Sequence, residues 1–514
     1  VNNFGFDPKR FEDPDAMIAK VHALGMRMAM WSTPYVEPGA THHQEVVDKG
    51  WYVGLPPLIK ANVKWGGPLD LTHPEVQSFW KGQIKKMTDR GIEGWKLDFA
   101  EDVHVGLAGV RFHYTFDDGS DERTMHHGYH LAYHRPYHEM LPADGGFILS
   151  RAGTYGDQVY SSVIWPGDLC ASFHRHRQCE DNVCHTGGLP ASVSAMLSLS
   201  TSGYPLYGAD TGGYRHGRPS KQLFMRWQAQ TALSAIMQIG GSEQCNPWDF
   251  AKYGASQFDQ EVLDAAVYFT RLHTRLFPYL YSHALAAHGH GRGVVRPFGL
   301  AYTELQPEAR FDELAVSQYL LGDSLLVAPV VDDKPGRDVM VPPGTWYSWW
   351  SHKPVAGDEA SARVLAETVP LDRIALYVRA GAIVPLLRPT IDTLAPATVA
   401  GVDSFANDVG RLYAVVTPGG SGQRTLYDGT VLGLQDQSDS LTLTVKPGKE
   451  FVAGVHFELW LAAPPKSVAI DGKALPSSSS ASTDGCAPCW LYRADSGVLE
   501  MALSGGAQVA SVTR

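Results

Sequence analysis

The sequence lacks any apolar run of about 20 residues, the length that a membrane-spanning helix requires, so no membrane association is expected. It also lacks an excess of basic residues, since 54 Asp and Glu stand against 43 Lys and Arg, for a formal net charge of −11. A nucleic-acid partner needs a basic surface and is therefore not expected. Charged residues make up 19% and hydrophobic residues 44%, which is typical of a folded protein rather than a disordered one. The length of 514 residues predicts two to four domains.

Cysteine is scarce, and the six are Cys170, Cys179, Cys184, Cys245, Cys486 and Cys489. An even number permits three disulfides and requires none. Cys486 and Cys489 have C-x-x-C spacing, but they follow a Ser-rich run at 477–480 and no strand-turn-helix pattern surrounds them. We therefore expect a local disulfide or two free thiols at this position, not a redox motif.

The sequence begins at Val1 with a helix-like segment, and we expect no signal peptide in these first residues. We expect the chain to be a processed product or a fragment. Its first residues do not distinguish a cytoplasmic protein from a secreted or periplasmic one, and the sequence does not indicate an oligomeric state.

Helix and strand signals alternate along the first 300 residues. Apolar spacing predicts a helix over 14–24, and Thr72 with Glu75 has the spacing of a capping box for the next one. Further expected elements are strands at 26–31, 94–99, 146–150, 163–165 and 205–209, and helices at 190–201 and 220–237. Repeated strand-helix units predict a parallel sheet, and polar residues at the strand ends favour a (β/α)8 TIM barrel, so the fold class is α/β.

Helical periodicity fades after about residue 310, and short apolar runs separated by Pro and Gly follow. These runs predict two antiparallel β-sandwich domains after the barrel. We assign residues 1–310 to an N-terminally incomplete catalytic barrel, 311–392 to a proximal β domain and 393–514 to a distal β domain.

Three acids stand at the ends of predicted strands, where a barrel enzyme places its chemistry. Asp98 shares a strand face with Lys96, Asp168 ends a Trp-Pro-Gly-Asp run, and Asp210 precedes Thr-Gly-Gly. A retaining glycosidase needs two carboxylates, one ionised nucleophile and one proton donor. Taken alone, an Asp at a strand end more commonly caps a helix or pairs with a cation.

Five segments, taken together, resemble glycoside hydrolase family 31, and the resemblance runs from about residue 8 to 390. The segment Gly94–Glu101 is similar to the family's nucleophile segment, which usually ends Asp-Phe-Gly-Glu or Asp-Met-Asn-Glu. The other four, in family order, are Ser150–Gly153, Trp165–Asp168, Gly208–Tyr214 and Leu371–Pro385, the last especially at Val378–Pro385.

The resemblance implies roles for individual residues. Asp98 is expected to be the nucleophile and Asp168 the general acid/base, with their carboxyls about 5–7 Å apart. Arg151 is expected to contact sugar hydroxyls, and cationic Arg151 and Lys96 to keep Asp98 ionised, while a drier wall keeps Asp168 protonated. The remaining substrate-binding residues implied are Lys96 and Asp210, which complete the same subsite, and Trp165, Tyr214, Trp31 and Trp65 as its walls.

The sequence departs from the family pattern in two places. A typical member carries a His shortly after the Arg-Trp of the helix that follows Asp210, and Gly240 stands near the matching position. We expect the segment 238–248 to line the pocket and set sugar preference, with Gln238, Glu243, Gln244 and Trp248 as candidates to replace the His. The family's N-terminal β-sandwich and first barrel strands are also absent, so we expect a longer protein or another piece that completes the fold.

The segment after Asp168 is rich in metal-ligand residue types, namely His174, His176, Cys179, Cys184 and His185. Their spacing matches no standard zinc pattern, and a surface loop with a Cys179–Cys184 disulfide is the favoured interpretation. The alternative is a metal-dependent hydrolase with Asp98 and Asp168 as metal ligands.

The resemblance implies a retaining, α-glucosidase-like hydrolase of α-linked oligosaccharides or glycosides, with no cofactor and no metal. A transglycosylase would use the same two acids, so the sequence leaves that alternative open. A non-catalytic sugar-binding relative is a further alternative, disfavoured because both acids are present. Glucose, xylose and galactose all remain open as the sugar, with glucose first.

Overall fold

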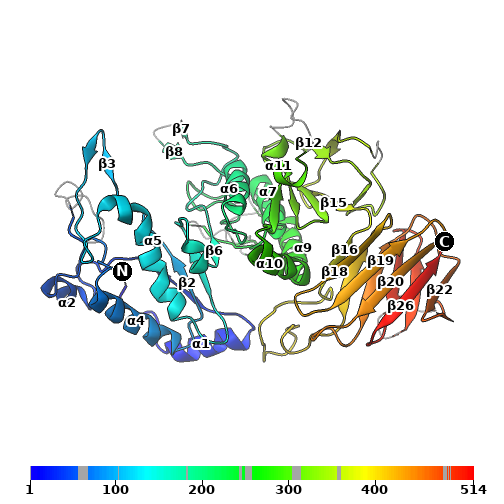
Figure 1. The fold of residues 1–514 in the computed structure, drawn as a ribbon, viewed down its shortest axis with the longest axis horizontal. Helices are drawn as coiled ribbons and strands as arrows, with labels where there is room; N and C mark the ends of the chain where they lie inside the picture. The colour runs from blue at the N-terminus through cyan, green and yellow to red at the C-terminus, as the bar shows by residue number, and fades with distance from the viewer. Residues whose placement is uncertain are drawn as a thin grey trace. The chain divides into compact units, whose positions relative to one another are not determined.

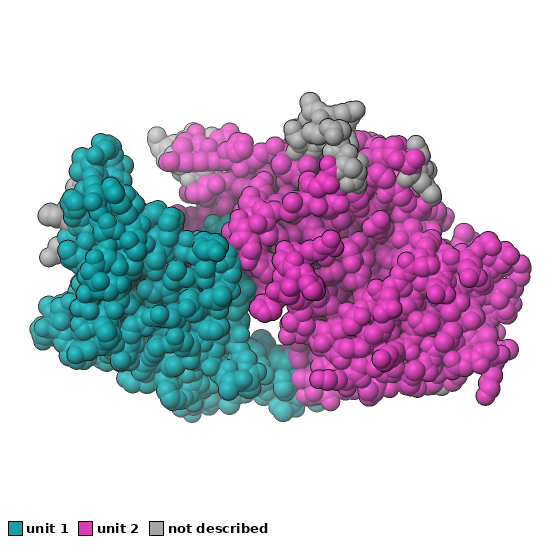
Figure 2. Space-filling view, in the orientation of Figure 1, with its two compact units in different colours: residues 1–167, 395–402 teal, residues 168–394, 403–514 magenta. Residues whose placement is uncertain are grey.

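The computed structural model describes residues 2–55, 67–101, 103–180, 183–241, 246–248, 258–303, 314–355, 360–478, 483, 486 and 488–514. Figure 2 shows the chain divided into two compact units. Unit 1 comprises Val1–Gly167 and Ala395–Val402, and unit 2 comprises Asp168–Leu394 and Asp403–Arg514.

Unit 1 is built on a parallel sheet with the strand order β1-β2-β5-β6. Its strands are β1 (Ala29–Ser32), β2 (Gly94–Leu97), β5 (Phe147–Ser150) and β6 (Val163–Ile164). The other elements, labelled where there is room in Figure 1, are α1 (Pro14–Ala23), α2 (His43–Asp48), α4 (Pro74–Thr88), β3 (Gly106–Leu107), β4 (Val110–Arg111), α5 (Glu122–Glu139) and η1 (Asp157–Val159). Long helices between parallel strands are the repeating unit that the sequence predicts.

The start of α4 differs from the predicted capping box. The N-cap is His73, whose Nδ1 accepts a hydrogen bond from the backbone N–H of Glu75 at 3.1 Å. Pro74 occupies the first helical position, which makes the residue directly before it the cap. The hydroxyl of Thr72 instead donates to Asp70, so the capping-box prediction is wrong.

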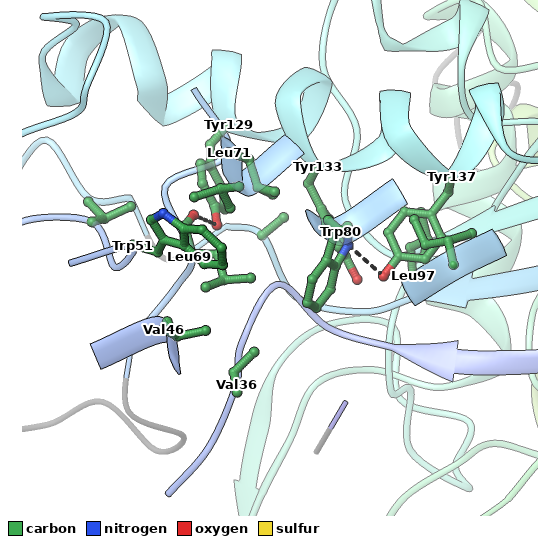
Figure 3. Close-up of a cluster of buried hydrophobic side chains, with 14 of the residues drawn as sticks. Val36, Val46, Trp51, Leu69, Leu71, Trp80, Leu97, Tyr129, Tyr133 and Tyr137 are labelled. Carbon is green, nitrogen blue, oxygen red and sulfur yellow. Dashed lines mark hydrogen bonds between the residues drawn. The ribbon is translucent and has the colours of Figure 1, made fainter. Parts of the chain in front are cut away.

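Aromatic side chains fill the core of unit 1 between α4, α5 and the sheet. Figure 3 shows Tyr129, Tyr133 and Tyr137 along one side of α5, as expected for residues spaced four apart on a helix. The indole of Trp80 donates to the hydroxyl of Tyr137 at 3.1 Å, and that hydroxyl lies 2.6 Å from the hydroxyl of Ser32 at the end of β1. Buried hydrogen bonds thus connect the helix layer to the strand ends.

Unit 2 begins with a hairpin and continues with helices. The elements are β7 (Gln178–Glu180), β8 (Val183–His185), α6 (Leu189–Thr201), α7 (Lys221–Ala232), α9 (Gln260–Arg275), α10 (Phe277–His290) and α11 (Phe298–Ala301). The strand predicted at 205–209 is wrong, since the described backbone there makes isolated bridges, such as Asp210 with Gln238, instead of a continuous ladder. The helix predicted over 220–237 ends earlier, at Ala232.

A five-stranded sheet and a two-stranded sheet follow the helices. The five-stranded sheet has the order β13-β15-β11-β10-β9, and β12 pairs with β14. The strands are β9 (Val295–Pro297), β10 (Tyr319–Leu321), β11 (Leu325–Ala328), β12 (Gly336–Val341), β13 (Trp346–Ser348), β14 (Arg363–Thr368) and β15 (Ala375–Arg379). All of these pairings are antiparallel, as predicted.

The last part of unit 2 is a β-sandwich of a five-stranded and a six-stranded sheet, with orders β16-β17-β21-β25-β24 and β18-β19-β20-β26-β22-β23. The strands are β16 (Ile383–Leu386), β17 (Leu412–Val416), β18 (Ser421–Thr425), β19 (Val431–Asp436), β20 (Ser440–Lys446), β21 (Val455–Trp460), β22 (Ser467–Ile470), β23 (Lys473–Ala474), β24 (Cys489–Arg493), β25 (Val498–Ala502) and β26 (Gln508–Thr513). Buried side chains of both sheets form one core. The pairing of β17 with β21 is parallel, an exception to the predicted antiparallel pattern.

The structure shows the state of Cys170, Cys179, Cys486 and Cys489. Cys486 and Cys489 form a disulfide, which is one of the two outcomes expected of that pair. Cys179 is also disulfide-bonded, and it lies opposite Cys184 in the β7–β8 register. Cys170 is a buried free thiol. Among the described residues, no His, Cys, Asp or Glu cluster of three or more is placed to hold a metal ion.

None of the described helices combines the length and the apolar character that crossing a bilayer requires.

The burial of His130 in α5, beside His134, makes the stability of unit 1 sensitive to acid. His134 Nδ1 lies 2.8 Å from Asp157 Oδ2, and both side chains are fully buried. Burial, together with the neighbouring His134, lowers the pKa of His130 from 6.5 to about 4. Because its pKa is lower in the folded state, the unfolded chain binds an extra proton between these two values.

We predict that the stability contributed by neutral His130 is complete above pH 6.5 and is lost as the pH falls toward 4, by up to about 3 kcal/mol. The His130→Gln variant should therefore lose less stability than the parent chain between pH 7 and pH 4.5 in urea unfolding. His113→Gln, at an exposed position, is the control and should follow the parent. Parallel pH profiles for the parent and His130→Gln would contradict the prediction.

Candidate active site

Asp98 directly follows β2, at the carboxyl end of a strand in the parallel sheet of unit 1. Its backbone N–H donates to the carbonyl of Ser32 at 2.9 Å, which continues the β1–β2 ladder by one residue. The residue is 9% exposed, so its carboxylate is largely removed from water. A buried carboxylate is costly unless it accepts hydrogen bonds or pairs with a cation.

Three donors satisfy the carboxylate of Asp98. Arg151 Nη1 lies 2.9 Å from Oδ1, which also accepts the backbone N–H of Phe99 at 3.0 Å. The indole of Trp31 donates to Oδ2 at 2.8 Å. The guanidinium adds a charge opposite to that of a carboxylate, and the two N–H groups complete the set of donors. The arrangement therefore gives a largely buried carboxyl group hydrogen-bond partners on both oxygens.

Arg151 reaches Asp98 because it occupies the equivalent position after β5. Its backbone N–H donates to the carbonyl of Leu97 at 3.0 Å, so the ends of β2 and β5 are level. Its Nη2 pairs with Glu101, and its guanidinium lies over the ring of Phe99 at 4.1 Å. Arg151 thus bridges two carboxylates. We assigned no role to Glu101 from the sequence, although it closes the segment that contains Asp98.

The turn after Asp98 has an unusual backbone conformation. Phe99 and Ala100 have φ values of 65° and 87°, in the left-handed region that L-residues adopt at a cost of about 1–2 kcal/mol each. This turn brings Glu101 back to Arg151. Gly or Asn at the position of Ala100 would adopt this positive φ at a lower cost than Ala.

Aromatic side chains border the same region of unit 1. Lys96 Nζ lies 4.4 Å from the ring centroid of Trp165, whose side chain is fully buried. Trp31 is 43% exposed, which leaves much of its ring accessible while its indole N–H binds Asp98. Trp65, the other predicted wall, lies outside the described residues.

Asp168 begins unit 2 and pairs with Arg215. Arg215 Nη2 and Nε lie 2.6 Å and 2.9 Å from Asp168 Oδ2. The pairing follows from the backbone, since Cys170 forms a parallel bridge with Arg215 and brings the two segments together. The Arg215 side chain is 53% exposed, so solvent screens this ion pair more than the one between Arg151 and Asp98. We did not single out Arg215 from the sequence, although it directly follows the Gly208–Tyr214 segment.

Asp210 is held by the segment that follows α7. It is 5% exposed, forms a parallel bridge with Gln238, and accepts a hydrogen bond from the Gln238 amide at 3.2 Å. A Cβ added to Gly240 would lie 2.3 Å from Asp210 Oδ1, so the carboxylate fills the space that a side chain there would need. Gln238, one of the four candidates to replace the missing His, is therefore in contact with Asp210.

Gly213 allows the same segment to pass close to the chain after Asp168. Its φ is 89°, and a Cβ would lie 2.6 Å from the backbone nitrogen of Ala171. Tyr214 follows and is half-buried, with its N–H bound to the carbonyl of Leu169. Asp168, Asp210 and Tyr214 are thus attached to one connected backbone region of unit 2.

Of the other three candidates in the 238–248 segment, the structure describes Trp248 alone. Trp248 is 60% exposed. Glu243 and Gln244 lie outside the described residues.

The sequence matches two family models. The glycosyl hydrolases family 31 TIM-barrel domain matches residues 1–283, and the glycosyl hydrolase family 31 C-terminal domain matches residues 291–384. These matches confirm the predicted fold class, a TIM barrel followed by a C-terminal β region.

Individual proteins are similar at lower identity. The alpha-xylosidase of Emericella nidulans is 28% identical over 75% of this chain and 47% of its own length. The isomaltosyltransferase of Sporosarcina globispora is 25% identical over 73% of this chain and 34% of its own length. The structure of the cycloalternan-forming enzyme from Listeria monocytogenes aligns with a TM-score of 0.80 at 22% identity, over 98% of this chain and 47% of that chain, which shows a shared fold. The chain spans about half the length of the first two curated relatives, or slightly more.

We predict that Ala100→Gly changes the free energy of unfolding by less than about 0.5 kcal/mol. Relief of the left-handed strain offsets the lost methyl burial and the added chain entropy. Ala209→Gly, at an equally buried Ala without a positive φ, has no such relief and should cost about 1–2 kcal/mol in urea unfolding. Similar losses in both variants would show that the turn at Ala100 is not strained.

We predict that Gly240→Ala lowers the free energy of unfolding by about 1–3 kcal/mol, because its methyl group collides with the Asp210 carboxylate in a packed region. Gly241→Ala is the matched control, since its Cβ would meet only Gly213 O at 3.5 Å, an ordinary contact, and its effect should stay within about 0.5 kcal/mol. Equal stabilities of the two variants, measured by denaturant unfolding, would refute the close approach of Gly240 to Asp210.

Proposed function

Because the chain belongs to glycoside hydrolase family 31, we propose that it is a retaining hydrolase of α-linked oligosaccharides or glycosides. The observation that carries the proposal is the setting of Asp98, a largely buried carboxylate that accepts hydrogen bonds from Trp31, Arg151 and the backbone of Phe99. A carboxylate fixed at a strand end by these three donors is oriented to attack an electrophilic carbon.

In the proposed reaction, an oxygen of Asp98 attacks the anomeric carbon while the bond to the leaving oxygen breaks. Asp168 donates its proton to that leaving oxygen, and a glycosyl ester of Asp98 remains. Asp168 then accepts a proton from water, the water oxygen attacks the anomeric carbon, and the ester bond breaks. Two displacements leave the configuration of the anomeric carbon unchanged.

The shared contact of Arg151 fits both halves of this cycle. When Asp98 becomes an ester it loses its negative charge, and an arginine paired with Asp98 alone would be left as an uncompensated buried cation. Arg151 also pairs with Glu101, so one carboxylate partner remains throughout. In this proposal Arg151, Lys96 and Asp210 bind sugar hydroxyls, and Trp31, Trp165 and Tyr214 form walls of the sugar site.

A transglycosylase is the second candidate, and the similarity to an isomaltosyltransferase favours keeping it. Both activities pass through the same glycosyl ester and differ in whether water or a sugar hydroxyl attacks it. A metal-dependent hydrolase fits less well, because the Asp98 carboxylate already accepts three N–H donors, one of them cationic. Product analysis with a disaccharide at rising concentration separates hydrolysis from transfer.

We predict that Asp98→Asn lowers kcat by roughly 10³-fold or more on every nitrophenyl α-glycoside, because the amide is a poor nucleophile. Asp168→Asn should lose about 10²–10⁴-fold on substrates with poor leaving groups and much less on dinitrophenyl glycosides, which need little protonation. The measurement is a panel of glucosides, xylosides and galactosides with both leaving-group types. The rate of each variant on each substrate and the anomer of the product are determined.

Asp144→Asn, at an exposed acid of unit 1, is the control and should retain the parent rate. Equal losses of Asp168→Asn on both leaving-group types would argue against Asp168 as the proton donor. An inverted product would overturn the retaining mechanism.

A further inference from the structure

A cavity of about 400 Å³ in unit 2 is lined by three arginines that the proposed reaction does not use. Arg292 follows α10, Arg296 lies in β9 and Arg379 ends β15. Hydroxyl groups of Ser200, Thr201 and Tyr302 and apolar side chains of Pro297, Leu300 and Leu320 complete much of the wall. The cavity therefore combines cationic, hydroxyl and apolar surfaces.

One acid, Asp323, is also among the lining residues, but its charge is already offset. Arg424 Nη2 pairs with Asp323 Oδ1, the hydroxyl of Ser324 donates to the same oxygen at 2.7 Å, and His283 Nε2 lies 3.6 Å from it. In the part of the chain that the structure describes, Arg292, Arg296 and Arg379 have no ion pair with any acid. The cavity therefore has a net positive charge, although the chain as a whole has a net charge of −11.

Arg296 is the least exposed of the three arginines. Its Nη2 lies 3.3 Å from His283 Nδ1, and its Nε donates to the carbonyl of Gly293 at 3.2 Å, so the guanidinium is fixed in place. Burial lowers its pKa below the usual value; Asp323 opposes this change, and the neighbouring cations Arg292 and Arg424 add to it. Cations around one cavity repel one another, most strongly at the half-buried Arg296, and a bound anion would relieve that repulsion.

We propose that this cavity binds a small molecule through a dianionic phosphoryl group. Guanidinium groups match phosphate oxygens in geometry and charge, and two or three of them around one cavity are typical of phosphate recognition. The hydroxyl and apolar walls leave room for an organic body attached to the phosphoryl group, so a sugar phosphate is the favoured class and inorganic phosphate the minimal ligand.

The experiment is isothermal titration of the full chain with inorganic phosphate, glucose 6-phosphate and glucose, at low ionic strength. We expect saturable binding of both phosphates, tighter for the sugar phosphate, and none of glucose at this site. Arg292→Gln and Arg379→Gln are suitable substitutions because both side chains are exposed, and each should weaken phosphate binding about tenfold. Arg123→Gln, at an exposed arginine of α5, should leave the affinity unchanged.

Absence of saturable binding below about 10 mM phosphate would overturn the proposal. Equal affinity of the parent, Arg292→Gln and Arg379→Gln chains would also overturn it, because the anion would then bind elsewhere. Inorganic phosphate bound as tightly as the sugar phosphate would reject the sugar-phosphate class and keep the phosphoryl site. Since titration requires no turnover, these outcomes do not depend on whether the chain hydrolyses glycosides.

Discussion

The candidate site of unit 1 depends on the register of β1, β2 and β5, whose last residues Ser32, Leu97 and Ser150 lie side by side. Asp98 donates its backbone N–H to Ser32 and Arg151 donates its own to Leu97, so each ladder extends one residue past its strand. Because the period of side chains along a strand is two, a slip of one residue would turn either side chain to the opposite face. The ion pair between Arg151 and Asp98 therefore depends on register, and the packing of Trp80 and Tyr137 beneath the strands supports that register.

Much of this arrangement could be predicted from sequence because it follows from regular structure. Apolar periodicity predicted most helices and strands of unit 1, and a strand end placed Asp98 where a barrel enzyme has its chemistry. The family resemblance implied that Arg151 lies beside it. The role of Glu101 could not be predicted in the same way, because it depends on Phe99 and Ala100 in left-handed conformations that their residue types disfavour. The cap predicted at Thr72 was wrong for a different reason, because Pro74 at the first helical position makes His73 the N-cap, and the Thr72 hydroxyl binds Asp70.

Several features of unit 2 could not be predicted from sequence patterns. The sequence indicated that Gly240 lacks a side chain, but only the tertiary structure shows that the Asp210 carboxylate occupies the space and that Gln238 binds it. Likewise, the acidic balance of the whole chain gives no sign of a cavity lined by three arginines, because net charge says nothing about how charges are distributed. Such features arise from residues far apart in sequence, for which no period or motif exists.

The close approach of Gly240 to Asp210 has a consequence for the evolutionary history of this protein. A His introduced at Gly240 would collide with the carboxylate that now occupies its space, whereas a change at Gln238 would remove one hydrogen bond that holds that carboxylate there. The effect of one substitution thus depends on whether the other has already occurred, which is epistasis with a steric origin.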